Sequence, residues 1–211
     1  MTDLVEQDFE TKLEVGEFRA DGVSIEAEIE AAKARLRGGR AEFLRAVGPV
    51  AVMPGAEESL ETTESYLAEF EAFVARLGVR HFSAHEFLTM GGSNSSGRCS
   101  GRNHLPPSGM WGAFAATARF ADAIRARLGS ALVVLSGYRS DSYNACIGGA
   151  SQSQHKLFCA LDISPLGASV QDLWGIARTI RAETPQFVGG IGKYKSFVHI
   201  DTRGANVDWV G

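Results

Sequence analysis

Apolar residues recur every three or four positions in several parts of the chain, a spacing that predicts amphipathic helices. The first stripe stops at the glycine pair 38–39 and consists of Ile25, Ile29, Ala32 and Leu36. A short helical piece is predicted at 41–47. A later stripe stops at Gly78 and consists of Leu67, Phe70, Val74 and Leu77. A longer helix is predicted over 106–128, and prolines mark 48–62 as a linker between the first helices and the rest.

The linker separates two parts of the chain that differ in charge. Residues 1–80 hold 17 acidic and 9 basic residues out of totals of 25 and 21, so residues 81–211 hold 8 and 12. The first part is strongly acidic, whereas the second has a small positive balance and no run of lysine or arginine. We therefore predict an N-terminal arm and linker over 1–62 and a domain over 63–211. The weak positive charge argues against nucleic acid as a partner.

In the second part, short β-branched or apolar runs predict buried strands. They fall at 131–139, at 157–163 and at SFVHID (196–201), which follows a glycine-rich turn. Ser169 is placed to cap a further helix. The loop at 90–105, MGGSNSSGRCSGRNHL, is long for a compact domain, and such loops are often functional or partly disordered.

Cysteine usage and the N-terminal sequence bear on the compartment. The three cysteines, Cys99, Cys146 and Cys159, are odd in number and scattered, which favours reduced thiols over a disulfide framework. The acidic start of the chain lacks the apolar segment of a secretory signal, and no apolar stretch is long enough to span a membrane. We expect cytoplasmic synthesis without a signal peptide and no membrane span.

Two histidines and one aspartate on or beside the predicted strands are candidate metal ligands. His155 precedes Asp162 by seven positions, and His199 lies in SFVHID. An unpaired carboxylate in an apolar strand is costly to bury, so Asp162 needs a compensating charge. Two imidazoles and one carboxylate suit Zn²⁺ and leave a fourth position for water, as in catalytic zinc sites. The alternatives are a core histidine satisfied by hydrogen bonds and an ion pair between Asp162 and an arginine such as Arg139.

Two stretches of the sequence resemble the zinc D-Ala-D-Ala carboxypeptidase family. They are SGYRSDSYNACIGGASQSQHKLFCALDIS (136–164) and GGIGKYKSFVHIDTRG (189–204), which follow the SGYRS…SxH…D…FVHxD pattern of one branch. The resemblance covers about residues 80–204. It implies an α+β fold in which a small antiparallel sheet is flanked by helices, here preceded by the partly helical arm. It also implies Zn²⁺ held by the two histidines and the aspartate, and hydrolysis of peptide bonds in peptidoglycan stem peptides.

The resemblance also suggests roles for residues around the metal. Arg139 matches an arginine that contacts substrate or the developing oxyanion, a role that suits a guanidinium fork; its structural alternative is an ion pair with a nearby aspartate. Ser153 and Tyr194 are candidate substrate-binding residues, and Ser153 is equally well explained as a turn residue. Asp201 and Tyr194 are the candidates for the general base. Asp201 shares a strand face with His199 and is preferred, either as the base or as a partner that orients His199.

The sequence departs from the family pattern at three positions. Ser196 stands where active relatives often carry a glutamate, and a serine cannot take a proton from water as a glutamate does. Phe158 replaces a usual glycine, and it could narrow the cleft or fill a gap in the core. Cys159 replaces a residue that is often polar or basic, and as a fourth ligand it would close the metal site to water.

Two functions are consistent with these features. The first is a zinc-dependent metallopeptidase, similar to D-Ala-D-Ala carboxypeptidases, that cleaves cell-wall stem peptides. The second is a structural component of a phage-like particle, such as a head-spike, tail or baseplate protein, that reuses the fold with weak or no catalysis. In the second case residues 1–62 would dock onto capsid or tail proteins. A protein without a signal peptide would reach the wall after lysis or as part of such a particle.

Overall fold

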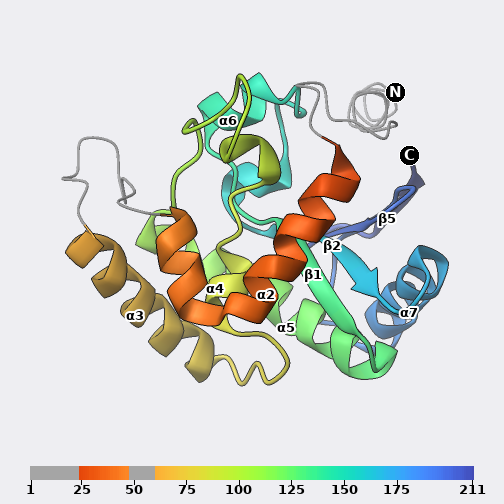
Figure 1. Cartoon of the computed structure of the whole chain (residues 1–211). Helices are drawn as coiled ribbons and strands as arrows, with labels where there is room; N and C mark the ends of the chain where they lie inside the picture. Colours follow the sequence, from red (N-terminus) through yellow and green to blue (C-terminus); the bar gives the residue numbers. More distant parts are fainter. Residues whose placement is uncertain (1–23, 48–59) are drawn as a thin grey trace.

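The computed structural model describes residues 24–47 and 60–211 (Figure 1). The first 23 residues and most of the predicted linker therefore lie outside the described residues. The helices are α2 (Ile25–Val47), α3 (Leu60–Arg76), α4 (Ala84–Phe87), α5 (Trp111–Leu128), α6 (Asp141–Cys146) and α7 (Val170–Glu183), with 3-10 turns η1 (Gly92–Asn94), η2 (Ser108–Met110) and η3 (Gln154–Leu157).

The described residues form a five-stranded sheet in the order β1-β2-β4-β3-β5. The strands are β1 (Ala131–Ser136), β2 (Ala160–Leu166), β3 (Gly190–Lys193), β4 (Val198–Asp201) and β5 (Val207–Val210). Neighbours from β1 to β3 are antiparallel, as expected, and β5 pairs in parallel with β3 at the edge. The α+β fold with a small sheet flanked by helices is confirmed. Strands β3 and β5 and helix α6 were not predicted separately, because four to six residues carry little periodic signal.

The two faces of the sheet have different coverings. Helices α5 and α7 pack on one face, where the strands contribute Leu132, Val134, Leu161, Ile163, Val198 and Ile200 to the main core. On the opposite face, Val133 and Leu135 of β1 pack with Ile25 and Ala32 of α2. Figure 1 shows α2 crossing in front of β1. Because side chains alternate along a strand, β2 and β4 direct Asp162 and His199 to the α2 side of the sheet.

The predicted helix boundaries are largely confirmed. Helix α2 is interrupted at Gly39, whose φ of 60° is left-handed, so the glycine pair separates two helical pieces. Helix α5 begins at Trp111, a few residues later than expected, because residues after the proline pair form a 3-10 turn first. Ser169 caps α7 by accepting a hydrogen bond from the Asp172 backbone N–H at 3.0 Å.

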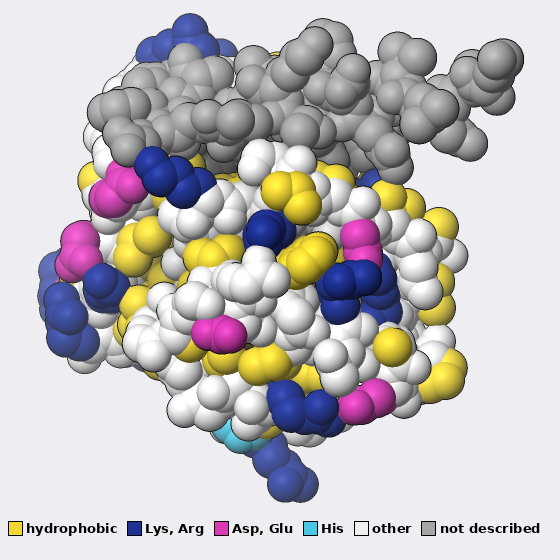
Figure 2. Space-filling view, turned by 90° about the vertical axis from the view of Figure 1, so that its right-hand side faces the viewer, with side chains coloured by type: hydrophobic (Ala, Val, Ile, Leu, Met, Phe, Trp, Pro, Cys, Tyr) yellow, Lys and Arg dark blue, Asp and Glu magenta, His cyan; other side chains and the backbone are white. Residues whose placement is uncertain are grey.

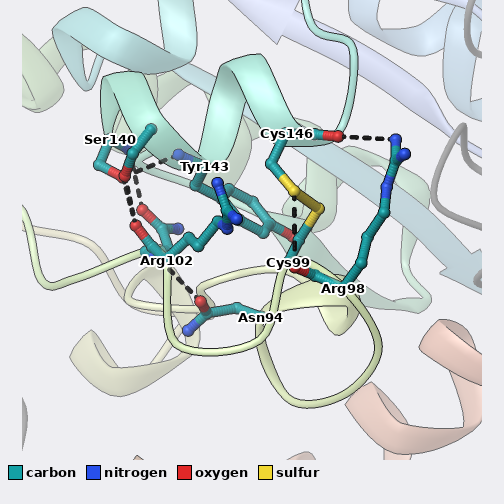
Figure 3. Close-up of a disulfide and its surroundings, with 9 residues drawn as sticks. Asn94, Arg98, Cys99, Arg102, Ser140, Tyr143 and Cys146 are labelled. Carbon is teal, nitrogen blue, oxygen red and sulfur yellow. Dashed lines mark hydrogen bonds between the residues drawn. A yellow bond between two sulfur atoms is a disulfide. The ribbon is translucent and has the colours of Figure 1, made fainter.

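The prediction of reduced cysteines was wrong for two of the three. Cys99 and Cys146 form a disulfide with a Cα–Cα distance of 5.8 Å, although 47 positions separate them in the sequence (Figure 3). It joins the loop at 90–105 to the end of α6. Such a pairing depends on which segments the fold brings together, so cysteine spacing alone does not reveal it. A disulfide is typical of an oxidising environment. Cys159 remains a free, buried thiol.

Helix α2, which lies within the predicted arm, packs against the domain. Besides its apolar contacts with β1, its buried Glu28 accepts a hydrogen bond from the Gly92 N–H at 2.8 Å. The described part of the arm therefore contributes to the packing of the sheet and of the loop at 90–105. The boundary at 62 and the docking role of 1–62 stay predictions. No helix among the described residues is both long and apolar enough to cross a membrane.

Candidate metal centre

Three polar residues from separate elements meet on the α2 side of the sheet. His155 lies in η3, Asp162 in β2 and His199 in β4. Asp162 and His199 are direct partners across the β2–β4 ladder, which places their side chains next to each other. The short turn η3 then brings His155 back over Asp162. All three side chains are buried.

The ligand atoms of these residues converge on one point. One carboxylate oxygen of Asp162, Oδ1, lies 3.2 Å from His155 Nε2 and 2.9 Å from His199 Nδ1. One potential metal-ligand atom of each residue lies within 4.8 Å of the ligand atoms of the other two residues. The imidazole rings are 5.0 Å apart and nearly perpendicular.

The orientation of each histidine is set by a hydrogen bond on its other nitrogen. His155 Nδ1 lies 2.6 Å from the carbonyl oxygen of Gly137, which can only accept, so Nδ1 carries the proton and Nε2 is the ligand atom. His199 Nε2 lies 3.0 Å from Asp201 Oδ2, so this nitrogen donates and Nδ1 faces Asp162. Partners of this kind hold metal-binding histidines in one tautomer.

Both aspartates are held by arginines. Asp162 directs Oδ2 to the Arg139 Nη2, and the Arg139 Nε donates to Ser136 Oγ at 2.9 Å. Asp201 accepts from Arg203 Nε at 2.9 Å and from the Gly190 N–H at 2.9 Å. The ion pair between Arg139 and Asp162 is the structural alternative considered for this arginine, and it leaves the other oxygen of Asp162 directed at the histidines.

The metal-free cluster is strongly polarised. Burial lowers the pKa of His155, and the nearby Arg139 lowers it further. Burial alone would raise the pKa of Asp162, but His155 and Arg139 outweigh it and hold that pKa well below its usual range. Burial would likewise lower the pKa of His199, yet hydrogen bonds with Asp162 and Asp201 raise it to about 10. At neutral pH, His199 is therefore protonated while His155 is neutral.

The donor set suits a divalent cation such as Zn²⁺. Two imidazole nitrogens and one carboxylate oxygen form the three-ligand set found in catalytic zinc sites. Arg139 and Arg203 already pair with Asp162 and Asp201, so a bound cation would take the place of the proton that His199 carries on Nδ1. Each ligand also has the outer hydrogen-bond partner that such sites require. His155, Asp162 and His199 are therefore suited to bind Zn²⁺.

A sequence profile of the peptidase M15 family matches residues 80–201, more than half of the chain. The chain belongs to the peptidase M15 family. The resemblance to zinc D-Ala-D-Ala carboxypeptidases is thereby confirmed, and the matched segment contains the three clustered residues together with Arg139 and Asp201. No curated protein matches the chain.

The other predicted site residues of this M15 domain lie at different distances from the cluster. Ser153 is buried immediately before η3, two residues from His155, and its side chain makes no capping hydrogen bond there. Tyr194 is buried in the α2-side cluster and stacks on Phe197 with ring centroids 4.5 Å apart. Its hydroxyl accepts a hydrogen bond from Trp209 Nε1 at 2.9 Å, and the Trp209 ring in turn lies beside that of His199.

The three departures from the family pattern have distinct structural outcomes. Ser196 lies in the turn before β4, where its carbonyl accepts from Ser164 Oγ at 2.7 Å. Phe158 adopts a left-handed backbone with φ 52°, which explains why a glycine suits this position, and its ring fills the core against Phe114 at 4.3 Å. Cys159 donates to the Gln154 side chain and is not part of the cluster; burial raises the pKa of its thiol to about 11.

Sequence reasoning missed two residues that border the site. Trp209, in β5 beyond the matched segment, places its ring 5.4 Å from that of His199 and is only partly buried. The sequence feature that goes with Trp209 is the pair of glycines at alternate positions, Gly190 and Gly192, in the neighbouring strand. A Cβ atom at Gly192 would lie 2.3 Å from the indole, so the tryptophan needs a glycine there. Arg203 continues the alternation of His199 and Asp201, a spacing that could have identified it.

The surface beside β5 and α7 is mixed in charge. Figure 2 shows basic side chains in several separate places on this face, interspersed with acidic and apolar ones. Among the described residues of this face, the basic side chains are therefore dispersed and do not form one patch.

Proposed function

We propose that this protein is a zinc-dependent peptidase that hydrolyses peptide bonds in peptidoglycan stem peptides. The observation that supports it most is the convergence of His155 Nε2, Asp162 Oδ1 and His199 Nδ1. A second polar atom of each side chain contacts a different partner, namely the Gly137 carbonyl, Arg139 and Asp201. Membership of the M15 family supports a peptidase. The choice of substrate follows from the motif resemblance to D-Ala-D-Ala carboxypeptidases.

A zinc ion bound by these ligands would polarise the scissile carbonyl and activate a water molecule for attack. The residues of the chain itself prepare the site for this chemistry. Arg139 holds Asp162 in its ligand orientation and adds positive charge beside the place where an oxyanion develops. Asp201 keeps the proton of His199 on Nε2, so that Nδ1 is directed at the metal.

We assign Asp201 to the orientation of His199 rather than to general base catalysis. Its carboxylate is buried and accepts hydrogen bonds from His199, Arg203 and the Gly190 N–H. These contacts outweigh the effect of burial and lower the pKa of Asp201 well below its usual range. A carboxylate that is so weakly basic is a poor acceptor for a proton from water.

The site geometry favours the peptidase over a purely structural component of a phage-like particle. A structural role does not require the three ligands and their outer partners to remain complete. Deletion of residues 1–62, the direct test of a docking arm, would also remove α2 and expose Val133 and Leu135 of the sheet. Docking onto a particle is better tested with substitutions in residues 1–23 than by deletion of the arm.

The test is to measure zinc and hydrolysis in the same preparation. Protein purified without chelators should contain about one zinc per chain, as in other three-ligand sites, and should release products from purified peptidoglycan stem peptides. His199→Ala should lose both. The matched control is His81→Ala, which removes an imidazole paired with Asp122 outside the cluster and should change neither. A His199→Ala protein that retains zinc and cleaves like wild type would show that the site is assigned wrongly.

A further inference from the structure

The segment that carries Arg139 has no regular secondary structure of its own. Residues 137–140 follow β1 and precede α6, outside any helix or strand. Yet the Arg139 guanidinium is almost fully buried and directed at Asp162. An arginine on an irregular segment can hold one orientation only if its backbone is held by other parts of the protein.

The side chain of Asn103 contacts the residues on both sides of Arg139. Its Nδ2 donates to the carbonyl oxygen of Tyr138 at 2.9 Å, and its Oδ1 accepts from the backbone N–H of Ser140 at 2.8 Å. The second hydrogen on Nδ2 is directed to the carbonyl of Met90 at 2.9 Å. One planar amide therefore links the two ends of the arginine segment to the start of the loop at 90–105.

The loop around Asn103 is itself tied down at several points. The Asn103 N–H donates to Asn94 Oδ1 at 2.7 Å, and the Arg102 carbonyl accepts from Ser140 Oγ at 2.8 Å. Figure 3 shows Asn94, Arg102 and Ser140 in the surroundings of the disulfide, where Cys99 of the loop is bonded to Cys146 at the end of α6. The loop that the sequence indicated as functional or disordered is thus an ordered support.

We propose that Asn103 is a positioning residue for Arg139, and through it for the metal ligand Asp162. The amide holds the peptide groups on both sides of Arg139 in the geometry that directs the guanidinium to Asp162 Oδ2. Without it, the arginine segment loses two hydrogen bonds in a buried place, and Asp162 loses the rigid partner that orients Oδ1 toward the histidines. The hydrogen bonds of Asn103 go to Asn94, Met90, Tyr138 and Ser140, and not to the three candidate metal ligands.

The decisive measurement observes Arg139 directly and does not depend on catalysis. The Arg139 Nε–H donates to buried Ser136, so its NMR signal should exchange slowly with water and can be assigned by its loss in Arg139→Lys. In Asn103→Ala, we expect this signal to shift and to exchange at least about tenfold faster, because the segment opens locally. If Asn103→Ala does not fold, Asn103→Asp retains the oxygen for Ser140 and loses the donors to Tyr138 and Met90, and it should show the same change.

The matched control is Asn94→Ala, which removes a hydrogen bond from the same loop without touching residues 138–140. It should lower thermal stability but leave the Arg139 signal as in wild type. The proposal is overturned if the signal is unchanged in Asn103→Ala and Asn103→Asp. It is also overturned if Asn94→Ala changes the signal equally, because loosening of the loop would then be sufficient.

A kinetic arm rests on the proposed function and tests the route through Arg139. Asn103→Ala should displace Arg139, the outer partner of Asp162, and so lower kcat/KM for stem-peptide hydrolysis by about tenfold to a hundredfold, the usual effect of losing such a partner. In an Arg139→Ala background the same substitution should have little further effect. Equal losses in both backgrounds would contradict the proposal. If wild type has no hydrolase activity, the proposed function fails while the NMR result still decides the role of Asn103.

Discussion

The two faces of β2 and β4 are built from alternate residues of the same strands, yet they are held together differently. On the α5–α7 face, Leu161 and Ile200 are fully buried among other apolar side chains. On the α2 face, the neighbouring positions are Asp162, His199 and Asp201, which are also buried. On these two strands, one side thus belongs to a hydrophobic core, and the other carries a buried polar cluster.

The difference shows that the two faces differ in how strictly they restrict the residue at each position. Apolar packing is not directional, so an apolar residue of similar size can replace another at modest cost. A buried charge requires a particular partner at a particular distance, since an unpaired one is far more costly. The partners on the α2 face come from loops and turns outside the two strands, such as Gly137, Arg139 and Arg203.

The largest expected effect is on the polar face. Asp162→Ala removes the carboxylate that faces the buried Arg139, and we expect it to lower the free energy of unfolding of the metal-free protein by about 3–5 kcal/mol. Urea unfolding in the presence of a chelator measures this. The double variant Asp162→Ala/Arg139→Met should recover much of the loss, because the unpaired charge is gone. A single variant as stable as wild type would show that the ion pair is not what the face depends on.

The next substitution, one residue away, tests the other face. Leu161→Ala leaves a cavity in the main core and should lower the free energy of unfolding by roughly 2–5 kcal/mol. The folded fraction should still bind zinc with wild-type stoichiometry, because the metal ligands project from the opposite face. Elemental analysis after gel filtration gives the answer. Loss of zinc from well-folded Leu161→Ala protein would mean that metal binding on one face depends on the packing of the other.

A smaller effect is expected when an outer partner is weakened. Asp201→Asn keeps an acceptor for His199 Nε2 but removes its charge, so zinc affinity should fall by about tenfold to a hundredfold. Titration of metal-free protein with zinc and a competing chelator measures the change. Asp208→Asn is the control, because this carboxylate pairs with Arg178 and Arg181 outside the cluster. Equal affinities of Asp201→Asn and wild type would exclude the orienting role.

The effect of pH is expected to have opposite signs for metal affinity and for the stability of the metal-free protein. The pKa of His199 is raised to about 10 in the metal-free protein, so zinc must displace a proton from Nδ1 at neutral pH. Zinc affinity should rise about tenfold per pH unit between pH 6 and 8. The stability that protonated His199 adds to the metal-free fold is complete below its unfolded pKa of about 6.5 and is lost as the pH rises through about 10.

These trends are measured by zinc titration and by urea unfolding with a chelator across the same pH range. The second measurement uses His199→Gln as its reference, since glutamine removes the ionisable group. A metal-free wild type whose stability relative to His199→Gln does not fall between pH 8 and 10.5 would contradict the raised pKa.

Most of the long helices could be predicted from local sequence patterns. The helices of α2, α3, α5 and α7 follow from apolar spacing and from their terminating glycines or capping serine, because these are interactions within a few residues. The ligand set was also predicted, since His155, Asp162 and His199 stand in a recognisable order near apolar strands. The short strands β3 and β5 were not, because four residues carry too little pattern to be distinguished from a turn.

Other features depend on which distant segments the fold brings together. The Cys99–Cys146 disulfide, the contact of Asn103 with both sides of Arg139 and the place of Trp209 beside His199 each join positions more than nine apart in the chain. The sequence by itself determined which residues can bind a metal and which helices can form, because both depend on residue type and short-range spacing. Only the tertiary structure decided which nitrogen of each histidine faces Asp162 and which loop holds the arginine, since each depends on a hydrogen-bond partner supplied by the packing of another segment.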